Sequence, residues 1–348
     1  MSWLKSLFTK AEAQNVRVDP AGLQLLVAPG ETILEQALKA GAAYPHDCTV
    51  GTCGACRTKL ISGKVDALTP FGYTLSREEI ESGYILACQA VPKTELVVEV
   101  ELQTQSEGHV TTKAKLVEAT LLTHDIMRVI WEADLPMHYR AGQYINVRWN
   151  NGDVHRSYSL ATAPENSGQT RLVTFIRHAP GGAFTDVLFS GEAQTFNYDL
   201  DGPHGQFWLR HGKGPILCIA GGSGLAPIIS LLEDAASKRT RRDCVLLFGG
   251  RGKRDLYCAD EIAAVRTKWT AGFDFWPVLS ESPEPDLRSG MVTTHIASAL
   301  ERLGPDVQAY LCGPPAMIDA AMTELVRLGV ATDAIFYDKF TDASTTQQ

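Results

Sequence analysis

Four cysteines are the residues of this chain whose spacing points most directly to chemistry. Cys48, Cys53 and Cys56 follow the order C-x4-C-x2-C, and Cys88 stands alone after a long gap. This spacing is typical of a plant-type [2Fe-2S] site, in which four thiolates hold two irons. The alternative is structural zinc, which usually takes its ligands as two separated C-x2-C pairs. The cysteines therefore predict a centre that accepts electrons one at a time.

Two glycines indicate how the backbone would wrap such a cluster. Gly51 and Gly54 lie between the first three cysteines. A loop around a cluster needs positive φ and must approach the sulfides closely enough to donate N–H bonds. We expect both glycines to meet that need.

A glycine-rich turn in the second half of the chain predicts a phosphate site. The apolar run 216–220 leads into a turn and then a helix, and this segment contains Gly221, Gly222, Ser223, Gly224 and Pro227. A strand, turn and helix in this order aim free N–H groups and the positive helix end at an anion. The turn is not the full G-x-G-x-x-G fingerprint, so its context carries the argument.

The end of the next expected strand bears on the choice between NADH and NADPH. Asp255 could hold ribose hydroxyls, whereas Arg251 or Arg254 could hold a 2′-phosphate. These residues leave the choice open.

A tetrapeptide and a turn in the middle of the chain together suggest a flavin nucleotide site. The tetrapeptide is Arg156, Ser157, Tyr158 and Ser159. In a strand Arg156 and Tyr158 would share one face, offering a guanidinium for phosphate and a phenol beside a ring. Downstream, Gly182 and Thr185 belong to a turn that leads into a helix, a second amide cradle for phosphate. Taken alone, the tetrapeptide is easily an ordinary barrel strand and the glycine segment an ordinary turn. The two together are more informative.

Two segments near the end are further candidates. Cys312 and Gly313 end an apolar strand at the carboxyl edge of the expected sheet, where ligands of such folds bind. The alternative interpretation is purely structural. Cys312 would then be a small buried residue, and the segment around Phe340 would be a last edge strand.

Composition bounds the function of the chain. Its 348 residues are more than a single domain usually contains. The content of 45% hydrophobic and 21% charged residues is typical of globular domains. The net charge of −8 argues against nucleic acid as a partner. No secretory signal pattern opens the sequence, so we expect reduced thiols and a cytoplasmic location. The uncharged stretch 214–232 is interpreted as a buried strand, loop and helix, with no transmembrane span.

The pattern of elements predicts three modules. Ranges 15–103, 113–210 and 211–348 are expected to form a β-grasp [2Fe-2S] ferredoxin domain, an antiparallel β-barrel for flavin, and a doubly wound parallel-sheet α/β domain for nicotinamide. In the first, we expect a hairpin over 15–28, helices capped at Thr32 and Ser76, and a strand over 95–102. Residues 104–112 are expected to be a linker.

The other two modules differ in their periodicity. Short β runs are expected at 114–130, 143–149, 157–161 and 171–177, with a helical segment near 184–189. Strands at 216–220, 245–248 and 309–312 then alternate with helices at 227–236 and 316–328.

Residues 1–14 are expected to form an amphipathic tail. Trp3, Leu4, Leu7 and Phe8 would share one helical face. We interpret the tail as disordered or packed on a domain, with a membrane-surface or partner-docking helix as the alternative.

Together these motifs resemble the iron-sulfur flavoprotein reductases of bacterial oxygenase systems, over about residues 15 to 340. The stretches that carry the resemblance are 45–48 (PHDC), 255–261 (DLYCADE), 277–281 (PVLSE), 290–293 (GMVT) and 324–331 (ELVRLGVA). The chain departs from the family pattern at Thr185, where serine is common, at Asp338, where glutamate is common, and in the eight residues after Phe340.

The resemblance implies roles for individual residues. Arg156 would bind flavin phosphate, Tyr158 would contact the flavin, and Ser159 would lie near flavin N5. The stretch Gly182 to Thr185 would hold the pyrophosphate of FAD, and Gly221 to Gly224 the nicotinamide cofactor. Cys312 would lie beside the nicotinamide, and Phe340 would cover the flavin ring. The family also favours NADH over NADPH and FAD over FMN.

A nicotinamide gives up two electrons as hydride and a [2Fe-2S] centre accepts one, so a flavin must stand between them. We therefore expect an NADH-dependent reductase that passes electrons through FAD and [2Fe-2S] to a terminal oxygenase or hydroxylase of hydrocarbon or aromatic metabolism. The acceptor stays open between a membrane-bound di-iron hydroxylase, a soluble Rieske dioxygenase and a sugar-deoxygenating enzyme. A non-catalytic electron carrier and a zinc-stapled binding protein are the alternatives outside this class. A peripheral position at the inner membrane face would accompany the membrane-bound acceptor.

Overall fold

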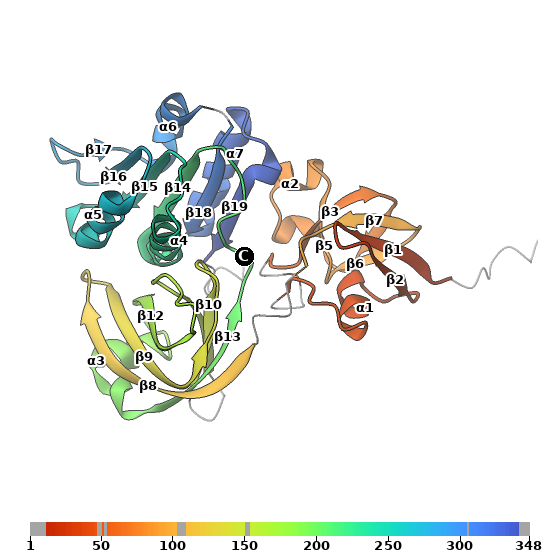
Figure 1. The fold of residues 1–348 in the computed structure, drawn as a ribbon, viewed down its shortest axis with the longest axis horizontal. Coiled ribbons are helices and arrows are strands. Elements are labelled where there is room, and N and C mark those ends of the chain that lie inside the picture. Colours follow the sequence, from red (N-terminus) through yellow and green to blue (C-terminus); the bar gives the residue numbers. More distant parts are fainter. Residues whose placement is uncertain are drawn as a thin grey trace, which may run out of the picture. The chain divides into compact units, whose positions relative to one another are not determined.

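The computed structural model describes residues 12–46, 51, 54–102, 109–149, 154–304 and 306–340. They belong to two compact units, Met1–Ser106 and Glu107–Gln348, which Figure 1 colours in chain order. The predicted ligands Cys48 and Cys53, and the apolar face of the amino-terminal tail, lie outside the described residues.

The first unit is built on a mixed sheet with strand order β2-β1-β7-β3-β5. Its strands are β1 (Gln14–Asp19), β2 (Leu23–Val27), β3 (Arg57–Ser62), β5 (Tyr84–Leu86) and β7 (Leu96–Glu99), with a separate pair of β4 (Val65–Ala67) and β6 (Ala90–Pro92). The predicted hairpin is confirmed as β1 and β2, and β7 runs parallel to β1. Alternation along β1 buries Val16 and Val18 completely. This is the expected β-grasp arrangement.

Both predicted capping boxes are confirmed. Helix α1 (Ile33–Lys39) starts after Thr32, and helix α2 (Arg77–Glu81) starts after Ser76. In each, the cap hydroxyl accepts an N–H bond from the residue three positions later, whose carboxylate accepts one in return. These exchanges fix where each helix begins.

The second unit begins with an antiparallel sheet curved into a barrel, in the order β11-β10-β13-β8-β9-β12 (Figure 1). The strands are β8 (Val110–Leu121), β9 (Ile126–Met137), β10 (Tyr144–Trp149), β11 (Val154–Ser159), β12 (Gln169–Arg177) and β13 (Asn197–His204), and α3 (Thr185–Ser190) precedes β13. Trp131 is fully buried among their inward side chains. The predicted antiparallel barrel is present.

Two expectations for this barrel need correction. The run 114–130, expected to be a single β run, is broken after Leu121, because the Thr123 hydroxyl accepts the N–H groups of Asp125 and Ile126 at 3.2 and 2.9 Å and turns the chain. Strand β8 starts at Val110, inside the segment expected to be linker, since pairing with β13 satisfies its backbone.

The rest of the second unit is a parallel sheet in the order β17-β16-β15-β14-β18-β19. The strands are β14 (Ile216–Gly221), β15 (Cys244–Gly250), β16 (Phe273–Leu279), β17 (Arg288–Ser289), β18 (Gln308–Gly313) and β19 (Ile335–Lys339). The helices are α4 (Leu225–Ser237), α5 (Ala259–Lys268), α6 (Ile296–Leu303) and α7 (Pro315–Arg327). One core packs α4 and α5, and the other packs α6 and α7, so the sheet is covered on both faces as predicted.

The strand order places a switch point between β14 and β18, where the chain changes direction across the sheet. The apolar stretch 214–232 forms β14, a short turn and the start of α4, as expected. Among the described helices, none has the length and apolar character to cross a membrane. Barrel residues such as Val173 and Phe175 share one core with the α4 side of the sheet, which fixes barrel and sheet to each other.

Candidate functional site

Two of the four predicted cluster ligands lie side by side in the core of the first unit. Cys56 and Cys88 are 2% and 5% exposed. The Cys88 N–H points at Cys56 Sγ at 3.5 Å, and Ala87 N–H donates to the Cys56 carbonyl at 3.1 Å. The fold thus brings together two thiols that are far apart in the sequence. The placement of Cys48 and Cys53 stays a prediction.

The loop glycines behave as a cluster loop requires. Gly51 and Gly54 have φ of +86° and +75°, so the expectation of positive φ is confirmed. A Cβ on Gly51 would lie 2.7 Å from Gln89 Cγ. Gln89 Nε2 itself lies 3.6 Å from Cys88 Sγ and donates to the Cys88 carbonyl at 2.9 Å. An N–H at a sulfur stabilises negative charge there, and the sequence analysis did not choose Gln89 as a candidate.

A buried ion pair braces the exit of the loop. Arg57 follows Cys56, and its Nη1 lies 2.5 Å from Oε1 of Glu79, whose side chain is fully buried. The Arg57 guanidinium also lies 4.8 Å from the centre of the Tyr84 ring. The pair therefore joins the start of β3 to α2.

In the second unit, the predicted flavin tetrapeptide forms the end of β11. Arg156 and Ser157 are exposed, Tyr158 is half-buried against the Phe184 ring at 5.8 Å, and Ser159 is buried. Burial raises the pKa of Tyr158, so its phenol stays neutral. The Arg156 guanidinium donates to the neighbouring His155 carbonyl and is otherwise open to solvent. This face can offer a cation, an aromatic surface and a hydroxyl in series.

The turn before α3 is held by the side chain of its threonine. Thr185 Oγ1 donates to the Ala179 carbonyl at 2.9 Å and accepts the Ala179 N–H at 3.2 Å. Gly182 packs against this pair of hydrogen bonds and donates its N–H to the Ala179 carbonyl. The Thr185 hydroxyl is thus committed to shaping the turn, and backbone groups remain as the contacts the turn can offer a phosphate.

A cavity of about 290 Å³ opens at the carboxyl ends of the parallel strands. Three predicted cofactor residues, Gly221, Gly222 and Asp255, line it. Ser223, Gly224, Pro227, Cys312 and Gly313 do not line it directly. The cavity lies outside the strand ends near the switch point, which is where open parallel sheets bind their ligands.

Gly224 serves the packing of this region. A Cβ there would lie 2.3 Å from the Cys312 carbonyl oxygen and 2.7 Å from the Gly313 nitrogen. Only glycine lets the start of α4 approach the end of β18 this closely. Pro227 is buried inside α4. These two predicted residues therefore position the turn.

Asp255 is used by its own loop. Its Oδ2 accepts the backbone N–H groups of Arg251 and Gly252 at 2.9 and 2.8 Å. Its Oδ1 lies 3.7 Å from Nδ1 of His124. The Oδ2 atom of Asp255 therefore stabilises the conformation of its own loop. Of the two candidate arginines, Arg251 lines the cavity and Arg254 does not.

Sequence reasoning missed two charged residues that the barrel contributes to the cavity. Arg177 ends β12, and Asp125 lies in the turn before β9; both line the cavity. Arg177 Nε lies 2.9 Å from Asp125 Oδ2, and a Cβ on Gly222 would be 3.7 Å from Arg177 Nη1. Burial raises the pKa of Asp125, but the Thr123 hydroxyl and Arg177 outweigh it and keep the pKa below its ordinary value. Arg177 is thereby fixed beside the glycine-rich turn, where a phosphate cradle is expected.

Three side chains from the two halves of the second unit meet at the edge of the sheet. Asp338 pairs in register with Cys312 across β18 and β19. Burial raises the pKa of Asp338 to about 6, and a hydrogen bond from Ser159 opposes the rise. Cys312 is fully buried, and burial with the nearby Asp338 raises the pKa of its thiol. The structure thus brings predicted Ser159 and Cys312 together through Asp338, which the sequence analysis did not choose.

Phe340 follows this edge. Its N–H donates to the Gly313 carbonyl at 3.0 Å, and its ring is half-buried against the core that contains Cys312. Phe340 therefore continues the line of β19 beside β18.

Comparisons with known proteins now decide the family. The chain matches the 2Fe-2S iron-sulfur cluster binding domain over residues 16–93, the oxidoreductase FAD-binding domain over 113–208 and the oxidoreductase NAD-binding domain over 218–323. It is 41% identical over 343 residues to the xylene/toluene monooxygenase electron transfer component XylA of Pseudomonas putida, covering 97% of this chain and 96% of that protein. The chain belongs to the iron-sulfur flavoprotein reductases.

Other reductases share this organisation. The reductase is 35% identical over 337 residues to the reductase subunit of an aromatic O-demethylase from Amycolatopsis, covering 94% and 99% of the two chains. Among solved structures, the Amycolatopsis reductase GcoB superposes with a TM-score of 0.70 at 33% identity, covering 95% of this chain and 99% of that one. A ferredoxin reductase of carbazole 1,9a-dioxygenase gives 0.66 at 26%, with the same coverage.

The described residues of the reductase fit a [2Fe-2S] cluster, FAD and NADH, the cofactors of these three domain families. Cys56 and Cys88 lie in contact with N–H donors around them. The exposed Arg156 next to Tyr158 suits a flavin nucleotide. Arg177 beside the glycine turn suits a dinucleotide phosphate in the cavity.

Proposed function

We propose that this reductase passes electrons from NADH to a terminal oxygenase or hydroxylase of hydrocarbon or aromatic metabolism. The observation that carries the proposal is the meeting of Ser159 of the barrel with Asp338 and Cys312 of the parallel sheet, in a chain whose other unit holds Cys56 against Cys88. Bound FAD supplies the conversion of a two-electron hydride into single electrons that a [2Fe-2S] centre accepts.

The proposed role of Ser159 and Asp338 is to stabilise the charge that develops during hydride transfer. A dihydronicotinamide becomes a cation when it loses hydride, and an ionised carboxylate nearby stabilises that developing charge. The Ser159 hydroxyl, hydrogen-bonded to Asp338, favours the ionised form. Cys312 adds a small neutral surface, since its thiol is buried and its pKa is raised. These residues position and stabilise; none of them transfers a proton in this scheme.

The remaining predicted residues would bind the two nucleotide cofactors. Arg156, Ser157 and the backbone from Gly182 to Thr185 would hold the phosphates of FAD, with Tyr158 against the isoalloxazine. Gly221, Gly222 and Arg177 would hold the nicotinamide dinucleotide. Phe340 would cover the flavin ring until the nicotinamide arrives, which its half-buried position next to Gly313 supports.

The nature of the acceptor is proposed from the relatives. Those named above are the electron transfer component of a xylene/toluene monooxygenase and the reductase subunit of an aromatic O-demethylase. An oxygenase acting on an aromatic compound is the acceptor we propose, and a membrane-bound di-iron hydroxylase is the specific form. We accordingly propose a cytoplasmic protein that contacts the inner membrane face through residues 1–14, because Trp3, Leu4, Leu7 and Phe8 would share one apolar face if this segment were helical.

The test is anaerobic reduction of the freshly purified protein by NADH, followed by optical and electron paramagnetic resonance spectroscopy. We expect flavin bleaching and a reduced [2Fe-2S] signal in the same sample. Addition of the candidate hydroxylase and its aromatic substrate should then give product in proportion to NADH. Flavin bleaching without the cluster signal would contradict the path through Cys56 and Cys88.

A deletion of residues 1–12 tests the location. We expect normal NADH–ferricyanide activity and weaker flotation with anionic liposomes. Equal flotation of both proteins would remove the proposed membrane contact.

A further inference from the structure

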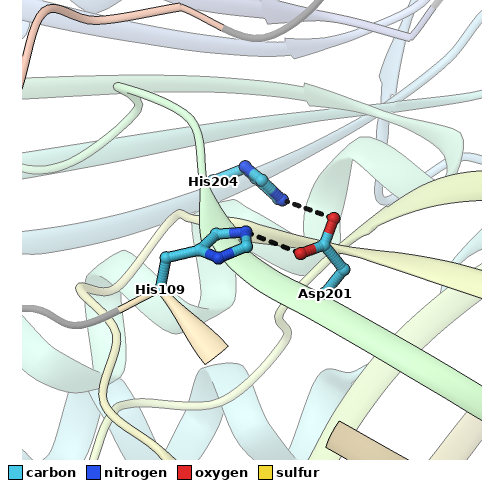
Figure 2. Close-up of side chains that lie close together, drawn as sticks. All are labelled: His109, Asp201 and His204. Carbon is cyan, nitrogen blue, oxygen red and sulfur yellow. Dashed lines mark ion pairs between the residues drawn. The ribbon is translucent and has the colours of Figure 1, made fainter. Parts of the chain in front are cut away.

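Two histidines and an aspartate that take no part in the proposed electron path lie together on the barrel. His109 immediately precedes β8, and Asp201 and His204 both belong to β13. Figure 2 shows both imidazole rings directed at the same carboxylate. His109 Nε2 lies 2.6 Å from Asp201 Oδ1, and His204 Nε2 lies 3.5 Å from Asp201 Oδ2. One donor atom from each residue falls within 4.8 Å of the other two.

The carboxylate at the centre of this cluster is fixed by its neighbours. The side chain of Asp201 is 6% exposed, and its Oδ2 lies 2.8 Å from Arg148 Nη2. The Thr111 hydroxyl donates to Oδ1 at 3.2 Å. A carboxylate held in this way is a pre-oriented ligand.

The imidazoles are oriented as well. The His204 ring lies 5.0 Å from the His109 ring and 5.5 Å from the Tyr144 ring, measured between centres. His204 is 19% exposed, whereas His109 is 53% exposed. His109 is therefore the member that can adjust its position, and solvent can reach the cluster from its side.

The donor set selects a class of cation. Two imidazole nitrogens and one carboxylate oxygen are typical of Zn²⁺ and similar transition metals, whereas Mg²⁺ and Ca²⁺ take oxygen ligands. Bonds of about 2.0–2.1 Å in a tetrahedron put ligand atoms roughly 3.3 Å apart. The His109–Asp201 contact of 2.6 Å must therefore open by a fraction of an ångström, which the exposed ring permits. Arg148 occupies Oδ2, so the carboxylate would bind through Oδ1 alone.

We propose that His109, Asp201 and His204 bind one zinc ion, with water at the fourth position. The ion would join the residue that leads into β8 to the end of β13. It would thus fix the point at which the chain enters the second unit, at the end of the segment expected to be a linker.

Zinc titration of the holoprotein tests this proposal. The sample is full-length protein with cluster and flavin loaded and the affinity tag removed, titrated at pH 7.5 against a chromophoric zinc chelator. We expect one equivalent of zinc in the wild type and at least tenfold weaker binding in His109→Gln and in His204→Gln. His211→Gln is the matched control, an exposed histidine in the connection before β14, and should bind as the wild type does. Magnesium and calcium should not compete.

A spectroscopic readout separates this site from the cysteines. X-ray absorption at the zinc edge should show nitrogen and oxygen neighbours at about 2.0 Å and no sulfur. Zinc should also raise the unfolding midpoint of the wild type and not that of His109→Gln. Sulfur neighbours, equal binding by His109→Gln, or no binding at all would each overturn the proposal and leave an ion-paired histidine cluster.

Discussion

The cluster loop of the first unit and the nucleotide cavity of the second are assembled in opposite ways. Three of the four predicted cluster ligands lie within nine residues, from Cys48 to Cys56. The cavity instead collects Asp125, Arg177, Gly221 and Asp255 from both the barrel and the parallel sheet. The first site is therefore specified mainly by residues close together in the sequence, whereas the second forms only when the barrel and the sheet pack on a common core.

The two regions also treat charge differently. In the first unit, Glu79 is fully buried against Arg57, and the pair braces the fold. Asp125 and Arg177 line the cavity and are 19% and 43% exposed. A buried pair stabilises the fold, whereas the partly exposed Arg177 is the cation that we propose for a phosphate. Five predictions test this contrast, beginning with the largest effect.

Replacement of a cluster ligand should separate the two regions completely. In Cys56→Ser we expect cytochrome c reduction to fall by about 100-fold or more, since single electrons lose their carrier, while NADH–ferricyanide turnover stays near that of the wild type. Iron content and both activities are the measurements. Cys218→Ser, a buried cysteine of β14, should keep its iron. Loss of ferricyanide turnover in Cys56→Ser would contradict separable halves.

Removal of a buried charge should cost stability in the first unit. Glu79→Ala leaves Arg57 without its carboxylate, so we expect unfolding of this unit to become easier by about 3–5 kcal/mol. Chemical denaturation followed by the cluster absorbance measures it. Glu81→Ala, on the same helix, removes an exposed pair with Arg77 and should change little. Similar losses in the two variants would show that burial does not set the difference.

Loss of the cavity cation should weaken binding of the dinucleotide. For Arg177→Gln we expect KM for NADH to rise about 10- to 100-fold with kcat nearly unchanged, because a charge-assisted hydrogen bond is lost in ground and transition states alike. Steady-state kinetics with ferricyanide measures this. Arg171→Gln lies on the same strand, pairs with Glu118 on the surface and is the control. An unchanged KM would remove Arg177 from the phosphate site.

Titration of Asp338 should give a smaller but characteristic effect. Its pKa of about 6 means that the carboxyl becomes neutral as the pH falls through this value, so hydride transfer should slow about tenfold below it. Asp338→Asn should be slow throughout and lack this inflection in stopped-flow flavin reduction. A retained inflection near pH 6 would assign it to another group.

The same group has a signed effect on stability. The folded pKa of Asp338 lies above its ordinary value of 3.8, so its stabilising contribution is complete below about pH 4 and is lost as the pH rises through about 6. The unfolding midpoint of the wild type, relative to Asp338→Asn, should therefore fall between those pH values.

Much of the fold was predictable because its signals are local. The two capping boxes, the hairpin turn, the strand before the glycine turn and the positive φ of Gly51 and Gly54 each depend on neighbours within a few residues. The two errors have different causes, a distant pairing partner for Val110 and a local side-chain hydrogen bond at Thr123. Val110 joins β8 because β13 pairs with it, and the turn at Thr123 breaks a run whose apolar pattern continues on both sides.

The sequence by itself determined the cysteine spacing, the three modules in order, and the family to which they belong, because cluster ligands and glycine turns act through residue type and short-range geometry. Only the tertiary structure decided that Asp338 lies between Ser159 and Cys312, that Arg177 reaches the glycine turn, and that Asp255 serves its own loop. Each of these depends on strand order and register. No periodicity within one segment encodes which strand end will lie beside another.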